Sequence, residues 1–243
     1  ANQFARHLID HHIKPGDIVP IISSKSSTLL IMILGILKAG AAYSPLNADS
    51  PTKHIEAVVK ETRAKYICVE SSLAERFVFG DDALLIKSGD MEERISAYSD
   101  DDIDGTSEES DLAYIIYTSG TTGNPKGGMI AHANLLFTYF SWEEAYNLSA
   151  TDTHLQMAPV GFDVFAGDWI RALCSGGILV LCPKGILIDS EKLYRLIEKE
   201  KVNCAEFVPA ILRQLISFVE KNNYNLSQLR LLVCGSDQWT MGE

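Results

Sequence analysis

In the first part of the chain, apolar and polar positions follow two patterns in turn, one typical of strands and one typical of helices. Short runs rich in β-branched and aromatic side chains predict buried strands. These runs span residues 18–22, 41–46, 65–69 and 83–87. Between them, residues 2–12, 26–38 and 51–62 repeat their apolar positions at the spacing of a helix with one buried face. Strands that alternate with helices predict an α/β fold of layered βα units with mostly parallel, covered sheets.

The same alternation continues to the end of the chain. Strands are predicted at residues 112–117, 154–158, 177–181, 202–208 and 229–234, and helices at residues 134–146, 162–173, 190–199 and 209–221. Between the two halves, residues 99–111 read SDDDIDGTSEESD. This acidic stretch is typical of a solvated connector, and a protein-binding acidic patch is the alternative. We therefore predict a first α/β subdomain over residues 1–110 and a second over residues 111–243.

Residues 112–127 read LAYIIYTSGTTGNPKG and carry the strongest chemical signal of the chain. The apolar first part predicts a buried strand, and the rest is rich in glycine and hydroxyl side chains. Such a loop can wrap a phosphate, because glycines let backbone N–H groups approach an anion and a lysine adds positive charge. The hydroxyl, glycine and lysine residues that precede Gly127 in this loop are Thr118, Ser119, Gly120, Thr121, Thr122, Gly123 and Lys126.

The residues of this loop allow two alternative interpretations. The P-loop pattern requires Gly before its lysine and Ser or Thr after it, whereas Lys126 lies between Pro125 and Gly127. A solvated turn is the other alternative, but such turns rarely gather so many hydroxyl groups directly after a buried strand. The phosphate interpretation is therefore favoured.

This segment resembles the signature loop of the adenylate-forming enzymes (the acyl-CoA synthetase and luciferase-like superfamily). The version most similar to it occurs in amino-acid adenylation domains of nonribosomal peptide synthetases. Residues 37–51 resemble the same family, with Asn47 where most members carry Asp. The resemblance implies that the loop holds the phosphates of ATP, that Mg²⁺ bridges phosphate oxygens, and that the chain is the incomplete, large N-terminal part of such an enzyme.

Two carboxylates suggest a site for a charged substrate. Asp163, in the segment GFDVFAGDW, follows a predicted strand and begins a helix, so it is either a helix N-cap or a partner for a substrate ammonium group. Glu206, in CAEFVPAIL, shares a strand face with Cys204 and Val208. A carboxylate buried without a partner would be costly, so Glu206 either faces solvent or meets a cation or hydrogen-bond donor.

The resemblance assigns further roles to these positions. It implies that Asp163 binds the α-amino group of an amino acid. It also implies a substrate pocket composed of Asp163, Val164, Gly167, Glu206, Leu232 and Cys234. Similar sets accept ornithine or a related basic amino acid. Asp168 could add charge, although an exposed first-turn carboxylate is the favoured interpretation. His132 could be a catalytic base, although a helix-start histidine that orders the loop is favoured.

Composition limits the partners of the chain. The 243 residues carry a net charge of -11, which argues against nucleic acid as a partner. The apolar run around residues 29–37 is too short to cross a bilayer, and the first residues do not form a signal peptide. The five cysteines are odd in number and lack a C-x-x-C pair. This favours reduced, buried thiols in the cytoplasm over a metal site or a disulfide framework.

The resemblance implies that the chain activates an amino acid as an aminoacyl-adenylate. The product would be loaded onto a peptidyl carrier protein domain beside neighbouring synthetase domains, in the biosynthesis of a secondary metabolite. The catalytic lysine of the family would lie outside this chain, so no catalytic residue is assigned, and we expect the chain alone to be weakly active or inactive. The alternatives are another adenylate-forming acyl or aryl-acid ligase, and a fragment that binds ligands without turnover.

Overall fold

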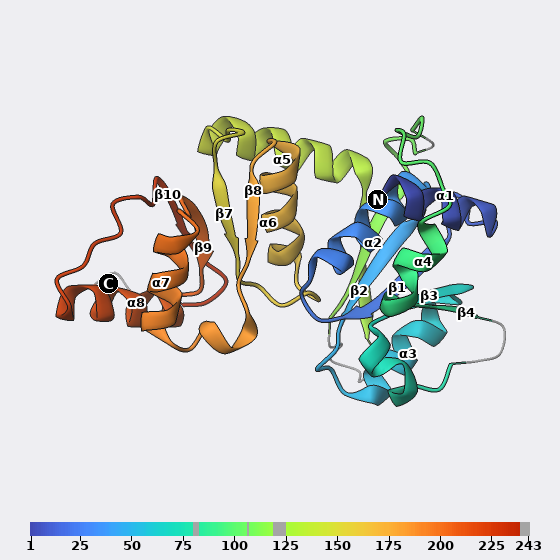
Figure 1. The fold of residues 1–243 in the computed structure, drawn as a ribbon, viewed down its shortest axis with the longest axis horizontal. Helices are drawn as coiled ribbons and strands as arrows, with labels where there is room; N and C mark the ends of the chain where they lie inside the picture. The colour runs from blue at the N-terminus through green and yellow to red at the C-terminus, as the bar shows by residue number, and fades with distance from the viewer. Residues whose placement is uncertain (80–82, 106, 119–124, 239–243) are drawn as a thin grey trace. The chain divides into compact units, whose positions relative to one another are not determined.

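The computed structural model describes residues 1–79, 83–105, 107–118 and 125–238. The chain divides into two compact units, Ala1–Phe137 and Thr138–Glu243. The first unit contains a six-stranded sheet in the order β4-β3-β1-β2-β5-β6. Figure 1 labels β1 to β4 of this sheet. Its strands are β1 (Ile18–Ser23), β2 (Ala42–Asn47), β3 (Tyr66–Val69), β4 (Leu84–Lys87), β5 (Leu112–Thr118) and β6 (Lys126–Ala131). All neighbouring strands are parallel except β5 and β6, which form an antiparallel pair.

Helices pack around the first sheet. They are α1 (Asn2–Asp10), α2 (Ser27–Lys38), α3 (Thr52–Thr62) and the short α4 (Met91–Ile95), with 3₁₀ turns at Ser71–Arg76 and Ser88–Asp90. The start of α2 is capped, since Oγ of Ser26 accepts a hydrogen bond from the backbone N–H of Leu29 at 3.1 Å. After α2 the chain reverses through Gly40, whose φ of 82° lies in the left-handed region that glycine tolerates.

The second unit contains a parallel four-stranded sheet in the order β10-β9-β7-β8. Its strands are β7 (Thr153–Gln156), β8 (Ile178–Leu181), β9 (Cys204–Phe207) and β10 (Leu231–Cys234). Its helices are α6 (Asp163–Cys174), α7 (Ser190–Lys199) and α8 (Pro209–Lys221), with a 3₁₀ turn at Lys184–Ile186. Helix α5 (His132–Tyr146) begins in the first unit and ends in the second.

The two faces of the second sheet differ in polarity. One face is apolar and packs with α7 and α8 through residues that include Leu155, Ala205, Phe207, Leu193 and Leu215. Because side chains alternate along a strand, the neighbouring residues point to the other face. These neighbours are His154, Gln156, Cys204 and Glu206, and α6 packs along β7 and β8 (Figure 1). The sheet therefore buries titratable side chains on one face and an apolar core on the other.

The predicted α/β fold with mostly parallel sheets is confirmed. The observed division of the chain, however, falls after Phe137 rather than at the acidic connector. The reason is strand pairing: Tyr43 of β2 pairs with Tyr114 of β5, so β5 and β6 extend the first sheet. The prediction of buried thiols was correct for Cys68, Cys182 and Cys204 and wrong for Cys174, which is exposed at the end of α6.

Candidate functional site

A cavity of about 420 Å³ opens in the second unit, where β7 and β9 end. Its wall includes Met157 and Pro159 after β7, Phe207 and Val208 at the end of β9, and Ser236 after β10. Asp163 and Glu206 are the carboxylates among its lining residues. Open α/β sheets bind ligands at the carboxyl ends of their strands, so this cavity is the candidate substrate site of the unit.

Asp163 is the first residue of α6 and is exposed at the cavity. The N-cap position belongs to Phe162, and Oδ1 of Asp163 accepts a hydrogen bond from the backbone N–H of Val164 at 2.9 Å. Asp163 therefore does not act as the N-cap. A carboxylate at this end of a helix is stabilised by the helix dipole, and it remains accessible to a substrate cation.

Glu206 meets a cation that belongs to the same chain. Nη2 of Arg171 donates to Oε2 of Glu206 at 2.7 Å and to Oδ1 of Asp168 at 2.7 Å. The side chains of Arg171 and Glu206 are 7% and 17% exposed. The guanidinium carbon of Arg171 also lies 4.7 Å from the ring centroid of Trp142, within the range of a cation–π contact. Of the alternatives that the sequence left open for Glu206, the structure selects a partially buried ion pair.

The environment of Asp168 differs from the one that the sequence predicted. The interpretation as an exposed first-turn carboxylate is wrong, because Asp168 lies in the second turn of α6 and is only 3% exposed. Its Oδ2 has no hydrogen-bond partner of normal geometry among the described residues, although the side chain of Gln156 is near it. Burial raises the pKa of Asp168 to about 7, against the opposing effect of Arg171. Asp168 therefore changes charge near neutral pH.

The structure brings only part of the predicted pocket to the cavity. Asp163, Val164 and Glu206 line it. Gly167 instead faces Trp142 and Arg171. A Cβ added to Gly167 would lie 3.2 Å from Cη2 of Trp142 and 3.2 Å from Nη1 of Arg171. Leu232 and Cys234 pair in register with Ala205 and Phe207, so they share the face of the sheet opposite to Glu206. Among the described residues, neither Leu232 nor Cys234 lines the cavity.

The predicted phosphate loop joins β5 to β6. Thr118 and Lys126 are exposed and pair across the two strands, and Oγ1 of Thr118 donates to the carbonyl oxygen of Lys126 at 3.5 Å. The predicted residues Ser119, Gly120, Thr121, Thr122 and Gly123 lie outside the described residues. The loop leads into a strand, whereas a P-loop leads into a helix. After the loop, Gly127 packs closely against β5, because a Cβ on Gly127 would lie 2.8 Å from Cγ2 of Ile115.

Comparison with known proteins identifies the family. The sequence profile of the family described as "AMP-binding enzyme" matches residues 1–241. The chain belongs to the AMP-binding enzyme family. The family indicated by residues 112–127 is thereby confirmed, and the curated relatives of the chain are nonribosomal peptide synthetases.

Two curated relatives show how much of a synthetase the chain spans. Gramicidin S synthase 2 of Brevibacillus brevis is 36% identical over 242 residues, which cover 99% of this chain and 5% of that protein. Bacitracin synthase 2 of Bacillus licheniformis is 33% identical over 244 residues, which cover 99% of this chain and 9% of that protein.

Solved structures of the family have the same fold. The N-terminal subdomain of NpsA from Klebsiella oxytoca, in complex with 3-hydroxyanthranilyl-AMSN, matches 98% of this chain and 59% of that chain with a TM-score of 0.81 and 26% identity. The nonribosomal peptide synthetase FmoA3, bound to alpha-methyl-L-serine-AMP, matches 96% of this chain and 26% of that chain with a TM-score of 0.86 and 23% identity. The second match shows a shared fold only.

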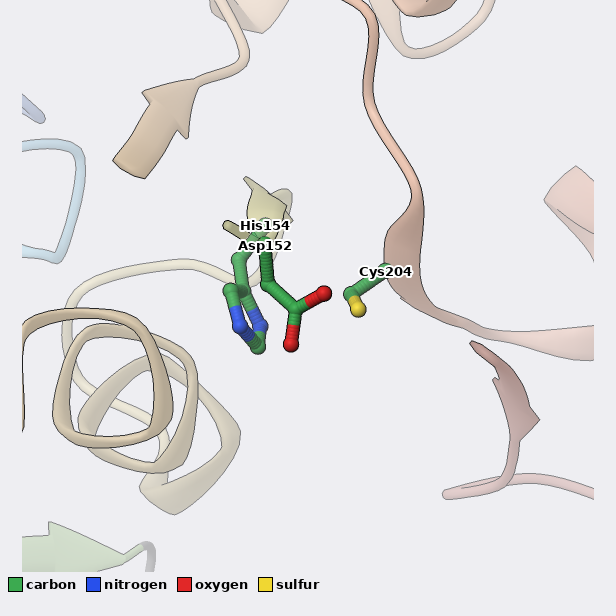
Figure 2. A group of neighbouring side chains, drawn as sticks. All are labelled: Asp152, His154 and Cys204. Atoms are coloured by element: carbon green, nitrogen blue, oxygen red, sulfur yellow. The ribbon is translucent and has the colours of Figure 1, made fainter. Parts of the chain in front are cut away.

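A second polar cluster in this AMP-binding chain has the composition of a metal site. The possible ligand atoms of Asp152, His154 and Cys204 lie within 4.8 Å of one another. Figure 2 shows the carboxylate of Asp152 between the other two side chains. However, Arg230 binds both oxygens of Asp152. Burial also raises the pKa of the Cys204 thiol to about 11, so this thiol is protonated at neutral pH. A guanidinium and a protonated thiol both oppose a cation, so we interpret this cluster as structural.

His132, a possible base in the sequence, is the first residue of α5. Its backbone N–H donates to the carbonyl oxygen of Asp111 at 2.9 Å, which ties the helix start to the residue before β5. Burial lowers the pKa of His132, so the imidazole is neutral at pH 7. Sequence reasoning did not single out Arg171 or Trp142. The helical spacing of Arg171 from Gly167 and Asp168 was a signal for the arginine, whereas Trp142 lies on another helix, α5, and had no such signal.

Proposed function

We propose that the chain is part of an amino-acid adenylation domain and activates an amino acid with a basic side chain, such as ornithine, as an aminoacyl-adenylate. The observation that carries the proposal is the pair of carboxylates on one cavity, Asp163 at the start of α6 and Glu206 on β9. Asp163 would bind the α-ammonium group of the substrate. Glu206 would face its side chain.

The proposed reaction transfers an adenylyl group. A carboxylate oxygen of the amino acid attacks the α-phosphorus of ATP, the bond from that phosphorus to the bridging oxygen breaks, and pyrophosphate leaves. The protein contributes by positioning the reactants and by stabilising negative charge. Thr118 and Lys126, together with the loop residues between them, would hold the phosphates. Mg²⁺ bound to ATP would supply positive charge at the phosphate oxygens.

The charges around the cavity support a cationic side chain. Asp168 and Glu206 are two carboxylates that share one guanidinium, that of Arg171. When both carboxylates are ionised, the three side chains keep one uncompensated negative charge. A substrate ammonium near Glu206 would balance it, whereas an apolar side chain would leave it unbalanced.

The proposed function includes partners that the relatives suggest. The adenylate would be transferred to the phosphopantetheine arm of a peptidyl carrier protein domain, in a synthetase with further domains. We place the reaction in the cytoplasm, supported by five free cysteines. In the part of the chain that the structure describes, no helix has both the length and the apolar character needed to cross a bilayer.

Amino-acid-dependent exchange of pyrophosphate into ATP tests the proposal. The panel is ornithine, lysine, arginine and leucine, assayed with the full natural polypeptide that contains this sequence. We expect ornithine to give the fastest exchange, and Glu206→Gln to reduce exchange with ornithine more than with leucine. A wild-type protein that exchanges faster with leucine than with ornithine and lysine would refute the basic substrate.

Another adenylate-forming acyl or aryl-acid ligase is the second candidate. It shares the loop between β5 and β6 but has no substrate ammonium for Asp163 to bind. Asp163→Ala separates the two candidates, because it should abolish exchange with an amino acid and leave activation of a simple acyl acid unaffected. A chain that binds amino acid and ATP without any exchange would support a binding fragment instead.

A further inference from the structure

We propose that Asp168 and Arg171 set the charge that Glu206 presents to the cavity, and so act as positioning residues that determine specificity for a cationic amino acid. This inference rests on the proposed function, because it concerns the same cavity. Asp168 and Arg171 are not among the described residues that line the cavity. They lie on α6 beside Glu206 and, together with Glu206, line a separate small space of about 10 Å³.

Glu206 connects the cavity to this buried pair. It lines the large cavity and also the small space that Asp168 and Arg171 line. A single nitrogen, Nη2 of Arg171, donates to both carboxylates at 2.7 Å. Charge-assisted bonds of this length are strong, so Arg171 fixes the carboxylate of Glu206 in the cavity wall.

The position of Arg171 is itself fixed by packing. Its guanidinium stacks over the ring of Trp142 at 4.7 Å, and the missing side chain of Gly167 leaves room for Nη1. Only 7% of the Arg171 side chain is exposed. Because these contacts hold the guanidinium behind Glu206, its positive charge acts on any group that binds beside Glu206.

Asp168 determines the net charge of the cluster. If Asp168 is ionised, two negative groups surround one positive group and the cluster carries one negative charge. If Asp168 is neutral, Arg171 cancels Glu206 and the cavity wall attracts a substrate ammonium much less. One unit of charge at a distance of several ångströms in a protein changes binding by on the order of tenfold. Asp168 can therefore influence substrate choice without touching the substrate.

Several other polar and charged groups face Asp168. Elements α6, β7 and β9 supply these groups, which are Arg171, Gln156, His154, Cys204 and Glu206. Burial lowers the pKa of His154 to about 4 and raises that of Cys204 to about 11, so both are uncharged. Burial places the pKa of Asp168 at about 7. Preference for a cationic substrate should therefore increase between pH 6 and pH 8.

The test compares ornithine with norvaline, which has the same carbon chain without the terminal ammonium group. The readout is the ratio of kcat/KM for the two substrates in ATP–pyrophosphate exchange, with the full natural polypeptide. We expect Asp168→Asn to reduce the ornithine to norvaline ratio by about tenfold. The double variant Asp168→Asn/Arg171→Gln should restore the ratio toward the wild-type value, because Glu206 again carries an uncompensated charge.

The matched control is Asp152→Asn, which neutralises another buried carboxylate bound to an arginine in the same unit. It should lower stability and leave the ratio unchanged, because Asp152 is not among the described residues at the cavity. A structural role for Asp168 alone would lower exchange with both substrates equally, and it would not predict recovery in the double variant.

The outcomes separate this inference from the proposed function. If ornithine is preferred but the ratio is the same in wild type, Asp168→Asn and the double variant, the inference is wrong and the proposed function stands. If the wild type shows no amino-acid-dependent exchange, the proposed function fails and the inference fails with it. If the variants do not fold, the wild-type pH series decides, and a constant ratio from pH 6 to pH 8 overturns the inference.

Discussion

At the scale of single residues, two aspartates on one helix have opposite environments. Asp163 is exposed at the first position of α6, at a cavity that would hold substrate. Asp168 lies little more than a turn later and is 3% exposed, against Arg171 and the sheet. The same residue type is therefore suited to contact a ligand at one position and to adjust the local charge at the other.

The raised pKa of Asp168 makes the stability of the protein depend on pH. The pKa of Asp168 is about 7 in the folded state and 3.8 for an ordinary aspartate, so between these values the folded state binds more protons than the unfolded state. The stabilisation is complete below about pH 3.8 and is lost as the pH rises through about 7. We expect the free energy of unfolding of the wild type to fall by about 2 kcal/mol relative to Asp168→Asn between pH 5 and pH 8. Urea denaturation of both proteins measures this difference, and a difference that does not vary with pH would contradict it.

The close packing around Gly167 leads to a second prediction about a single residue. A Cβ on Gly167 would already lie 3.2 Å from Trp142 and Arg171, so a larger side chain must displace them. We expect Gly167→Leu to cost about 1–3 kcal/mol of stability, the usual cost of overpacking. Gly185→Leu is the control, since a Cβ there meets nothing within 4 Å, and it should cost less. Thermal unfolding of both variants provides the comparison, and equal shifts in Tm would count against the packing argument.

At the scale of elements, Arg230 joins three parts of the second unit. It lies just before β10 and binds both oxygens of Asp152, which precedes β7. It also donates to the carbonyl oxygens of Tyr146 and Asn147 at the end of α5. Asp152 is 1% exposed, and its backbone N–H and side chain also form a turn with Ser149. The bond between Asp152 and Arg230 therefore connects two strands that are not neighbours in the sheet.

Loss of this arginine should be costly. Arg230→Ala would leave the Asp152 carboxylate buried without its cation, and we expect a loss of about 2–4 kcal/mol in the free energy of unfolding. Arg195→Ala is the matched control: Arg195 pairs with Glu191 at 2.6 Å on the exposed side of α7. Exposed pairs contribute little, so this control should cost less than about 1 kcal/mol. Chemical denaturation of the two variants would disprove the argument if the losses were similar.

At the scale of the whole molecule, the chain consists of two α/β units with different contents. Ala1–Phe137 contains the strands on both sides of the phosphate loop, and Thr138–Glu243 contains the cavity with Asp163 and Glu206. The proposed reaction would need both, because the residues proposed to bind the phosphates and those proposed to bind the amino acid belong to different units. We also propose, from the family resemblance, that a catalytic lysine outside residues 1–243 takes part in the reaction.

That proposal predicts a difference between this chain and a longer one. We expect residues 1–243 alone to show weak or no ATP–pyrophosphate exchange, and the full natural polypeptide to show exchange with its preferred amino acid. Binding of ornithine to the short chain, measured by calorimetry, is the control that the cavity is intact. Exchange by the short chain at the rate of the long one would show that residues 1–243 suffice.

Much of the fold could be predicted because local patterns were strong. The helical spacing of residues 26–38 and the Ser26 cap agree with α2, and the helices predicted at residues 190–199 and 209–221 coincide with α7 and α8. The short helix α4 was missed, because five residues carry too little periodicity to be recognised. The division of the chain was placed differently because a composition change at residues 99–111 does not reveal which sheet β5 joins.

The sequence by itself determined the fold class and the family and predicted a phosphate loop, because each depends on residues that are neighbours along the chain. Only the tertiary structure decided what surrounds the charged side chains. Arg171 and Glu206 are 35 positions apart, and Asp152 and Arg230 are 78 apart. The pairing of a charge depends on which strands and helices pack together, and side-chain contacts of this kind have no local signature in the sequence.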